Sequence, residues 1–328
     1  MSGYSFQKII FGLIILLFLS FTSKGQHTGP KGFSQQLSII TENDRYLFQG
    51  KDGYYTNGLI INYSRVHRTK NTAILKQVNQ YEIGQKIFTP YSRKIYVVTQ
   101  IDRPVTGYLY AKFSRSNFIA HNQLWQWGVS VGTIGKASLG EALQDAFHKM
   151  IHVNSDWWGW IWDYQLKSNV GINLHGQYAR GLLNTNTSSF LQITPVTQAT
   201  LGTSFTNVSQ GLLLQVGKFN LLHQSAYWNA SVQDKQVPQF VKPELFFYYY
   251  PEVLYQLYNA TVQGGLFRKE KGPITSSIKP FVVMHQIGAL FAQNRYTLRL
   301  GTTFQTKEAR SQRYNHSYGS IHIGYRFN

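Results

Sequence analysis

Cysteine, acidic residues and long apolar runs are scarce or missing in this chain of 328 residues. Without cysteine there is no disulfide framework. After Gln26 no stretch approaches the roughly 18 consecutive apolar residues that a transmembrane helix needs, so no spanning helix is expected. A phosphate-binding Walker loop and the GxSxG elbow of serine hydrolases are also missing. These absences argue against a helical membrane protein, a P-loop nucleotidase and a serine hydrolase of the elbow type.

The shortage of acid leaves the chain strongly basic. Lys and Arg number 32 against 14 Asp and Glu, which gives a formal net charge of +18 at pH 7. Such an excess predicts an anionic partner, either nucleic acid or phosphorylated lipid headgroups, although a solvated basic surface is the simpler alternative.

The N-terminus predicts export. Residues 1–25 contain a basic Lys8, an apolar run from Ile9 to Leu19, and the small residues Ser23 and Gly25. This pattern is typical of a secretory signal peptide, and the run is short for a membrane anchor, which is the alternative. Export argues against a nucleic-acid partner. We expect residues 26–328 to form one domain, because no linker, repeat or low-complexity segment divides them.

Several segments alternate apolar and polar residues with the period of a β-strand. A soluble β-sandwich would also alternate. Here, however, the apolar positions are often large aromatics and the others small and polar, as on the lipid and lumen sides of a transmembrane barrel. Aromatics make up 15% of the chain, and the last strand ends on Phe327, followed by Asn328. We therefore predict an all-β, antiparallel transmembrane barrel. The alternating segments are 59–63, 125–131, 172–178, 199–205, 296–304 and 321–327.

The stretch from Val129 to Gln165 differs from the rest. It reads as a strand, a Gly-rich turn, a helix from Leu139 to about Val153, and a Trp cluster. An apolar stripe on this helix is predicted to pack it against the scaffold; the stripe consists of Leu139, Leu143 and Phe147. A helix inside a chain that otherwise consists of strands suggests an insertion that carries functional side chains.

A second face of the helix is polar. Gln144, His148 and His152 follow one another at intervals of four residues. A zinc pair is disfavoured, because HKMIH lacks the Glu beside its first His and only Asp156 could supply a third ligand. A histidine on such a helix is more often packed or solvated than catalytic. If one acts as a base, the missing Ser or Cys nucleophile indicates direct attack by activated water.

The polar motif from Thr41 to Gly58 suggests a second cluster. Asn43 and Asp44 end the first expected strand, and Thr56 and Asn57 begin the second. Hairpin pairing would bring their oxygens together, and hard oxygens are the ligands that Ca²⁺ prefers. Ordinary turn chemistry is the alternative, because Asn, Asp and Gly favour turns.

Six motifs in order resemble the lipid A 3′-O-deacylase (LpxR) family of Gram-negative outer membranes. They are NDRY…DGYYTNG, GQKIFTP, DRPVTGYLY, IGKASLGEALQDAFHKMI, the GW…Q of 159–165, and the terminal YGSIHIGYRF. The resemblance spans about Leu37 to Phe327. It implies a barrel of about twelve strands with a short active-site helix at one rim, located in the outer membrane. It also implies calcium-dependent hydrolysis of the 3′ acyl ester of lipid A.

The resemblance also assigns roles to residues. Asn43 and Asp44 match the family's early Asn-Asp pair and would hold Ca²⁺, and Thr56 matches its hydroxyl residue. Gln144 and His148 match its helical pair, with neutral His148 activating water. Lys94, after the FTP of GQKIFTP, is the candidate for the family's lysine, although loop positions 93 and 94 read equally as plain structure. Where the family has an acidic residue this chain has Asn154, and Asp156 could substitute.

The partner implied is lipid A or lipopolysaccharide, met by a monomer in the outer membrane. Two alternatives remain open. A catalytically inactive structural or porin-like barrel would keep the strands but need neither Gln144 nor His148. An outer-membrane phospholipase should carry a Ser beside a His in an HxSNG-like strand, and that motif is absent.

Overall fold

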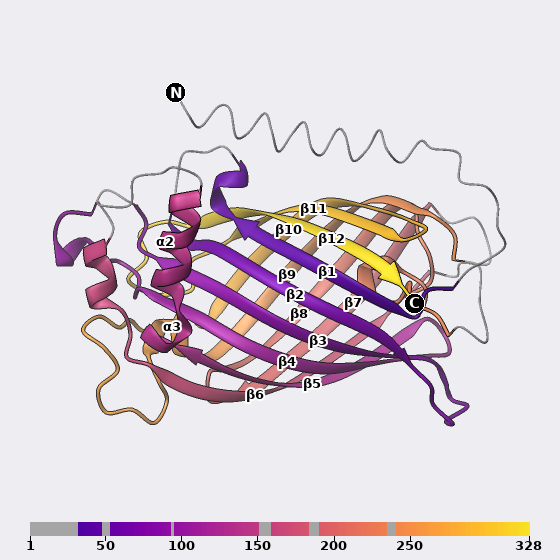
Figure 1. Cartoon of the computed structure of the whole chain (residues 1–328), viewed down its shortest axis with the longest axis horizontal. Coiled ribbons are helices and arrows are strands. Elements are labelled where there is room, and N and C mark those ends of the chain that lie inside the picture. The colour runs from indigo at the N-terminus through magenta and orange to yellow at the C-terminus, as the bar shows by residue number, and fades with distance from the viewer. Residues whose placement is uncertain (1–31, 48–52, 93–94, 151–158, 184–189, 235–240) are drawn as a thin grey trace.

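The computed structural model describes residues 32–47, 53–92, 95–150, 159–183, 190–234 and 241–328, and for Phe147, His148 and Met150 the backbone only. Twelve antiparallel strands form a closed barrel in which each strand pairs with its sequence neighbours and β1 pairs with β12 (Figure 1). The predicted barrel and its strand number are confirmed. No helix in the described ranges is long and apolar enough to cross a membrane. The strands are β1 (Gln35–Asn43), β2 (Tyr54–His67), β3 (Ile74–Thr89), β4 (Thr106–Ile119), β5 (Gln123–Ile134), β6 (Asn169–Arg180), β7 (Leu191–Gly202), β8 (Phe205–Lys218), β9 (Glu244–Asn259), β10 (Phe281–Gln293), β11 (Tyr296–Gln305) and β12 (His316–Phe327).

The alternating pattern sorts side chains between the two sides of the wall. On β1, Leu37 and Ile39 are 42% and 49% exposed on the outside, while Gln36 and Ser38 are buried in the lumen. Successive side chains of a strand point to opposite faces, so one apolar and one polar face follow from the sequence. The outer face suits lipid and the inner face suits polar contacts.

The two ends of the barrel differ. The start of β1 and the end of β12 lie at one end, here called the terminal end, and helices α2 and α3 lie at the other, here called the outer rim (Figure 1). Outer-membrane barrels have short periplasmic turns and longer extracellular loops. Connections 90–105, 135–168 and 260–280 at the outer rim are long, whereas those at the terminal end are shorter apart from 219–243. This asymmetry assigns the outer rim to the cell exterior. The rim elements are η1 (Asp44–Leu47), η2 (Val98–Gln100), η3 (Lys136–Ser138), α2 (Gly140–Met150), η4 (Gly159–Tyr164) and α3 (Ala260–Gln263).

The predicted helix is present as α2, beginning one residue later than expected. Its expected extension to Val153, and the positions His152, Asn154 and Asp156, fall outside the described residues. The predicted signal peptide, residues 1–25, also lies outside the described part.

The lumen is filled near the terminal end. The connection between β8 and β9 folds inward, through η5 (Ala226–Trp228), and buries Leu222, Ala230 and Val232 against inward residues of the wall. Polar contacts fix it there: Lys76 Nζ donates to the carbonyl of Ala230 at 2.8 Å. A filled lumen is unfavourable for diffusion, which weakens the porin-like alternative.

This filling predicts low conductance. In planar bilayers the wild type should give no steady channel current of porin size, because the inward segment occupies the path. Replacing residues 221–233 by a Gly-Ser linker should open a conductance, provided the variant still shifts on heating in gels. Porin-like currents from the wild type would contradict the assignment of this segment as a plug.

Candidate active site at the outer rim

Helix α2 lies on the outside of the barrel wall. A Cβ added to Gly140 would come 3.0 Å from Gly107 Cα on β4, and the reverse distance is the same. Gly107 has the same parity along β4 as Ala111, which is exposed on the outside. The helix also contacts β3 and stands across the strands in Figure 1. A Cβ at Gly107 would also come 2.3 Å from Ser138 Oγ in the turn before the helix, so a side chain there requires this turn to shift away from the wall.

An apolar cluster outside the wall completes the docking. It contains Ile87 of β3, three residues of the β3–β4 loop, and the buried pair Ile161 and Trp162 of η4, with Leu143 packed against it. Leu139 was predicted to join this stripe, and that prediction is wrong. Leu139 is 61% exposed, because it precedes the helix with a positive φ of 59° and so leaves the helical register. The side chain of Phe147 is not described.

The side chain of Gln144 on α2 is buried and hydrogen-bonded to η4. It is 4% exposed, and its Oε1 accepts a hydrogen bond from Trp162 Nε1 at 3.1 Å. Its Nε2 is buried without a hydrogen-bond partner among the described residues. His148 follows one turn later on the same face, with its backbone in α2 and its imidazole outside the described part. The structure thus fixes the helix that carries His148, through Gln144 and Trp162.

The pairing of β1 to β4 indicates the direction in which α2 runs across the wall. Asn43, Asn57, Ile87 and Gly107 are successive partners across β1 to β4. Strands lie roughly 4.8 Å apart, so about 14 Å separates Gly107 from Asn43. A helix rises about 1.5 Å per residue, so the eight residues from Gly140 to His148 cover about 12 Å. Because α2 starts over β4 and passes over β3, it carries the His148 backbone toward the end of β1.

Asn43 and Asp44 lie at that end, as predicted. Asn43 closes β1 and pairs with Asn57, and its Oδ1 accepts from the backbone N–H of Arg45 at 2.8 Å. Asp44 is buried, and its Oδ2 accepts from the N–H of Gly53 at 2.7 Å. Both bonds are turn contacts of the kind the alternative interpretation expected.

Thr56 makes its own contact at this rim. A bulge between Tyr55 and Asn57 turns Thr56 toward β3, where its hydroxyl lies 2.5 Å from that of Thr89. The structure therefore brings Thr56 to the same rim, where its hydroxyl is paired with that of Thr89. Residues 93 and 94, including the candidate Lys94, lie outside the described ranges.

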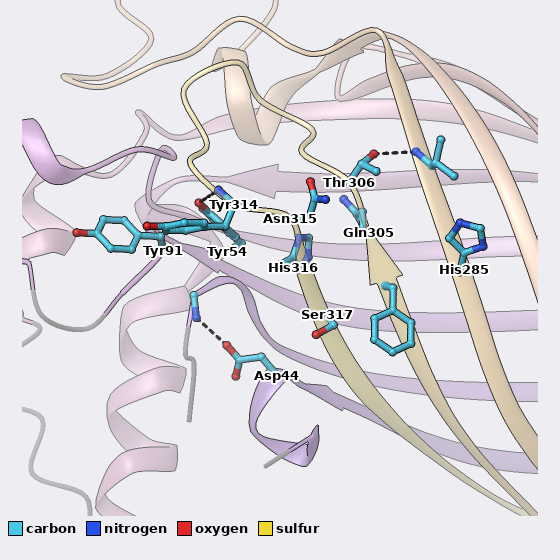
Figure 2. A pocket seen from close by; sticks show the side chains of 13 residues that line it. Asp44, Tyr54, Tyr91, His285, Gln305, Thr306, Tyr314, Asn315, His316 and Ser317 are labelled. Carbon is cyan, nitrogen blue, oxygen red and sulfur yellow. Dashed lines mark hydrogen bonds between the residues drawn. The ribbon is translucent and has the colours of Figure 1, made fainter. Parts of the chain in front are cut away.

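A hollow of about 360 Å³ opens beside Asp44 (Figure 2). Asp44, Gly53, Tyr54 and Tyr91 form one side, and residues of β10 to β12 with their loop form the other. Gly53 is required here, because a Cβ would lie 2.6 Å from the carbonyl oxygen of Pro90. No local pattern predicted the second side, because its residues lie 192 or more positions further along the chain than those of the first.

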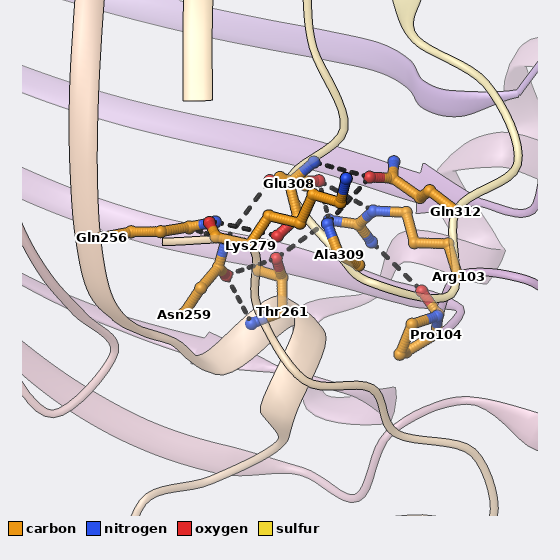
Figure 3. Close-up of polar contacts among 9 residues, drawn as sticks. All are labelled: Arg103, Pro104, Gln256, Asn259, Thr261, Lys279, Glu308, Ala309 and Gln312. Atoms are coloured by element: carbon orange, nitrogen blue, oxygen red, sulfur yellow. Dashed lines mark hydrogen bonds and ion pairs between the residues drawn. The ribbon is translucent and has the colours of Figure 1, made fainter. Parts of the chain in front are cut away.

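The neighbouring residues Asp102 and Arg103 join the loops around this hollow, a role that sequence reasoning missed. Asp102 Oδ2 accepts from the Tyr54 hydroxyl at 2.6 Å and from the N–H of Arg313 at 3.0 Å. Arg103 is fully buried and donates twice to Glu308 Oε1, at 2.9 and 2.6 Å (Figure 3). It also donates to Thr261 Oγ1 at 3.0 Å. Loops after β1, β3, β9 and β11 are thus joined.

The charge of Arg103 sets the ionisation of Glu308. Burial alone would raise the pKa of Glu308, but the charges of Arg103 and His316 and the hydrogen bonds from Arg103 and Asn259 lower it below its ordinary value. Glu308 therefore stays ionised at neutral pH, and the ion pair persists.

The donors at the end of β1 are of the hard-oxygen type. Amide and carboxylate oxygens of Asn43 and Asp44 suit Ca²⁺ and not a soft metal. Within the described residues no three His, Cys, Asp or Glu side chains gather in a possible metal cluster. A cation here would need backbone or ligand oxygens in addition.

Comparison with known proteins agrees with the fold. The family model described as "Outer membrane protein LpxR" matches residues 11–327. The solved structure of LpxR from Salmonella typhimurium has a TM-score of 0.70 and 21% identity, covering 89% of this chain and 100% of that chain. The β-domain of the Bordetella autotransporter BrkA has a TM-score of 0.45 and 8% identity, covering 90% and 99%. Comparison with curated protein sequences found no match.

The ion pair at the rim predicts a pH-dependent stability. Since the pKa of Glu308 is lowered in the folded state, its contribution is present above the unfolded value of about 4.3 and is lost as the pH falls through the folded value. Glu308→Gln leaves Arg103 buried and unpaired, which typically costs about 3–5 kcal/mol. At pH 7 the variant should unfold at a lower temperature than the wild type, as followed by Trp fluorescence. The difference in unfolding temperature between the wild type and Glu308→Gln should become smaller below pH 4. An equal difference at pH 3 and pH 7 would contradict a stabilising ion pair between Arg103 and Glu308.

Proposed function

The chain belongs to the LpxR family of outer-membrane proteins, and on this premise we propose that it is a calcium-dependent lipid A 3′-O-deacylase. One observation carries the proposal: α2 lies on the outer side of the wall and contacts β4 and β3. Its direction carries the His148 backbone toward the end of β1, where Asn43 and Asp44 lie. An acyl ester of a lipid in the outer leaflet can reach such a site laterally, from within the membrane. A site inside the lumen would require the lipid to leave the bilayer.

His148 is the base in this proposal. Neutral imidazole takes a proton from water, and the hydroxide adds to the carbonyl carbon of the 3′ acyl ester. The tetrahedral intermediate then expels the 3′ oxygen of the sugar, which takes the proton from His148. The products are a free fatty acid and a sugar hydroxyl. Trp162 and Gln144 keep the helix, and with it the base, in place.

Asn43 and Asp44 would hold Ca²⁺, with Asp44 fixed by the Gly53 N–H. Bound Ca²⁺ would polarise the ester carbonyl and stabilise the oxyanion, together with polar groups such as Asn43. Thr56 supports the rim through Thr89. Lys94 would bind the anionic headgroup of lipid A.

The remaining alternatives have weaker support. A porin-like barrel has no use for a filled lumen or for a helix docked outside the wall. An outer-membrane phospholipase lacks its serine motif here. We also propose that the enzyme acts as a monomer, with lipopolysaccharide as its partner and no nucleic acid.

The first test replaces the base. Loss of a general base typically lowers a rate by roughly 10²–10⁴-fold, so His148→Ala should release the 3′ acyl chain from purified lipid A at least about 100-fold more slowly. His152→Ala is the matched control and should retain most activity. Both variants should insert and shift on heating like the wild type, because α2 lies outside the barrel wall. Wild-type rates from His148→Ala would remove the residue from the mechanism.

The second test addresses calcium with the same assay. Asp44→Ala removes the only carboxylate of the proposed pair, so activity should fall and excess Ca²⁺ should partly restore it. The wild type should lose activity in a calcium chelator and regain it when Ca²⁺, but not Zn²⁺, is returned. Undiminished activity of the wild type in chelator would exclude the metal from the reaction.

A further inference from the structure

A belt of aromatic side chains follows the outer wall near the terminal end. Its rings contact one another at centroid distances of 5.3 to 6.5 Å. Aromatic girdles of outer-membrane barrels lie at the membrane–water interface. This belt therefore marks the headgroup level of the leaflet opposite to the outer rim. In order around the wall the belt consists of Tyr296, Tyr325, Phe327, Tyr63, Tyr81, Phe113 and Trp127.

A basic and polar row lies just beyond the belt, on the side of the terminal end. Arg65, Asn79 and Arg115 are register partners on β2, β3 and β4. Each lies two residues from its strand's belt residue, so all three face outward, roughly 7 Å further along the wall. Arg115 Nε donates to Asn79 Oδ1 at 2.8 Å, and its guanidinium lies 5.8 Å from the ring centre of Trp127.

A hollow of about 740 Å³ opens beside Arg65 and Asn79 of this row. Its lining consists of Ser34, Gln35, Arg65, Val66, His67, Arg68, Asn79, Tyr81 and Asp234. Arg65 is exposed, and its side chain has no hydrogen bond or ion pair with any residue in the described ranges. The acid at the edge, Asp234, receives Arg68 on both carboxylate oxygens, at 2.6 and 2.8 Å. The hollow thus presents donors and positive charge, since its one acid is already matched by an arginine.

The wall continues from the hollow into an apolar face. On β2 and β3, Ile61 and Ile83 are register partners on the far side of the belt, 46% and 61% exposed. Cations, then aromatics, then aliphatic side chains follow the order of phosphate, glycerol and acyl chain in a phospholipid. We propose that this hollow binds a glycerophospholipid of the periplasmic leaflet, with its phosphate on Arg65 and on Asn79, whose side chain Arg115 holds in place. This site is independent of the proposed deacylase activity.

Native mass spectrometry of the purified barrel, titrated with phosphatidylglycerol, tests the site. The wild type should retain one lipid, and Arg65→Gln should weaken its binding roughly tenfold, the loss expected for one charged hydrogen bond. Arg180→Gln is the matched control: Arg180 is exposed at the same end of β6 but does not line the hollow. Arg65→Lys should keep part of the affinity.

Two further probes separate the sources of the phosphate. Diacylglycerol, with the same chains but no phosphate, should bind at least tenfold more weakly than phosphatidylglycerol. Inorganic phosphate at equal concentration should not displace the lipid. If Arg65→Gln and Arg180→Gln lower the affinity for phosphatidylglycerol equally, the arginines attract lipid headgroups without a specific site, and the proposal is overturned. Displacement by inorganic phosphate would make it a free-anion site and overturn the assignment to lipid.

Discussion

Helix α2 lies close against the barrel wall at a point where two glycines meet. Gly107 removes a side chain from the outer face of β4, and Gly140 removes one from the first turn of the helix. Everything proposed for the site follows from this approach: the helix crosses the strands, Gln144 is buried against Trp162, and the backbone of His148 is carried toward the end of β1. The contact also places the chemistry outside the wall, where a lipid can reach it without leaving the membrane.

A second constraint holds the loops around the site. Asp102 and Arg103 are neighbours in sequence, and both bind the loop between β11 and β12, through the N–H of Arg313 and through Glu308. Asp102 also accepts from Tyr54, and Arg103 also donates to Thr261. A buried arginine is tolerated because its charge is matched by Glu308 and its plane lies 4.1 Å from the ring centre of Phe88. The rim is therefore a network of polar contacts, while the helix is held by apolar packing and a glycine contact.

The sequence was most informative where its pattern is local. Period-2 alternation predicted the wall, and the spacing of Gln144 and His148 predicted a shared helical face, because both depend on neighbours within a few residues. The pairing of Asn43 with Asn57 followed from a short hairpin. Leu139 was misplaced because a single positive φ breaks the helical register, which composition does not reveal. The Arg103–Glu308 pair joins residues 205 positions apart, and no pattern in one sequence predicts such a contact.

The central claim is that a helix docked outside the wall makes this barrel a lipid A deacylase, and mass spectrometry of lipid A from living cells tests it most directly. Cells that express the wild type should contain lipid A lighter by one 3′ acyl chain. Gly107→Val, which pushes α2 from the wall but leaves the strand pairing of β4 intact, should yield unchanged lipid A at equal barrel content. Unmodified lipid A with the wild type, or full deacylation by Gly107→Val, would contradict the account.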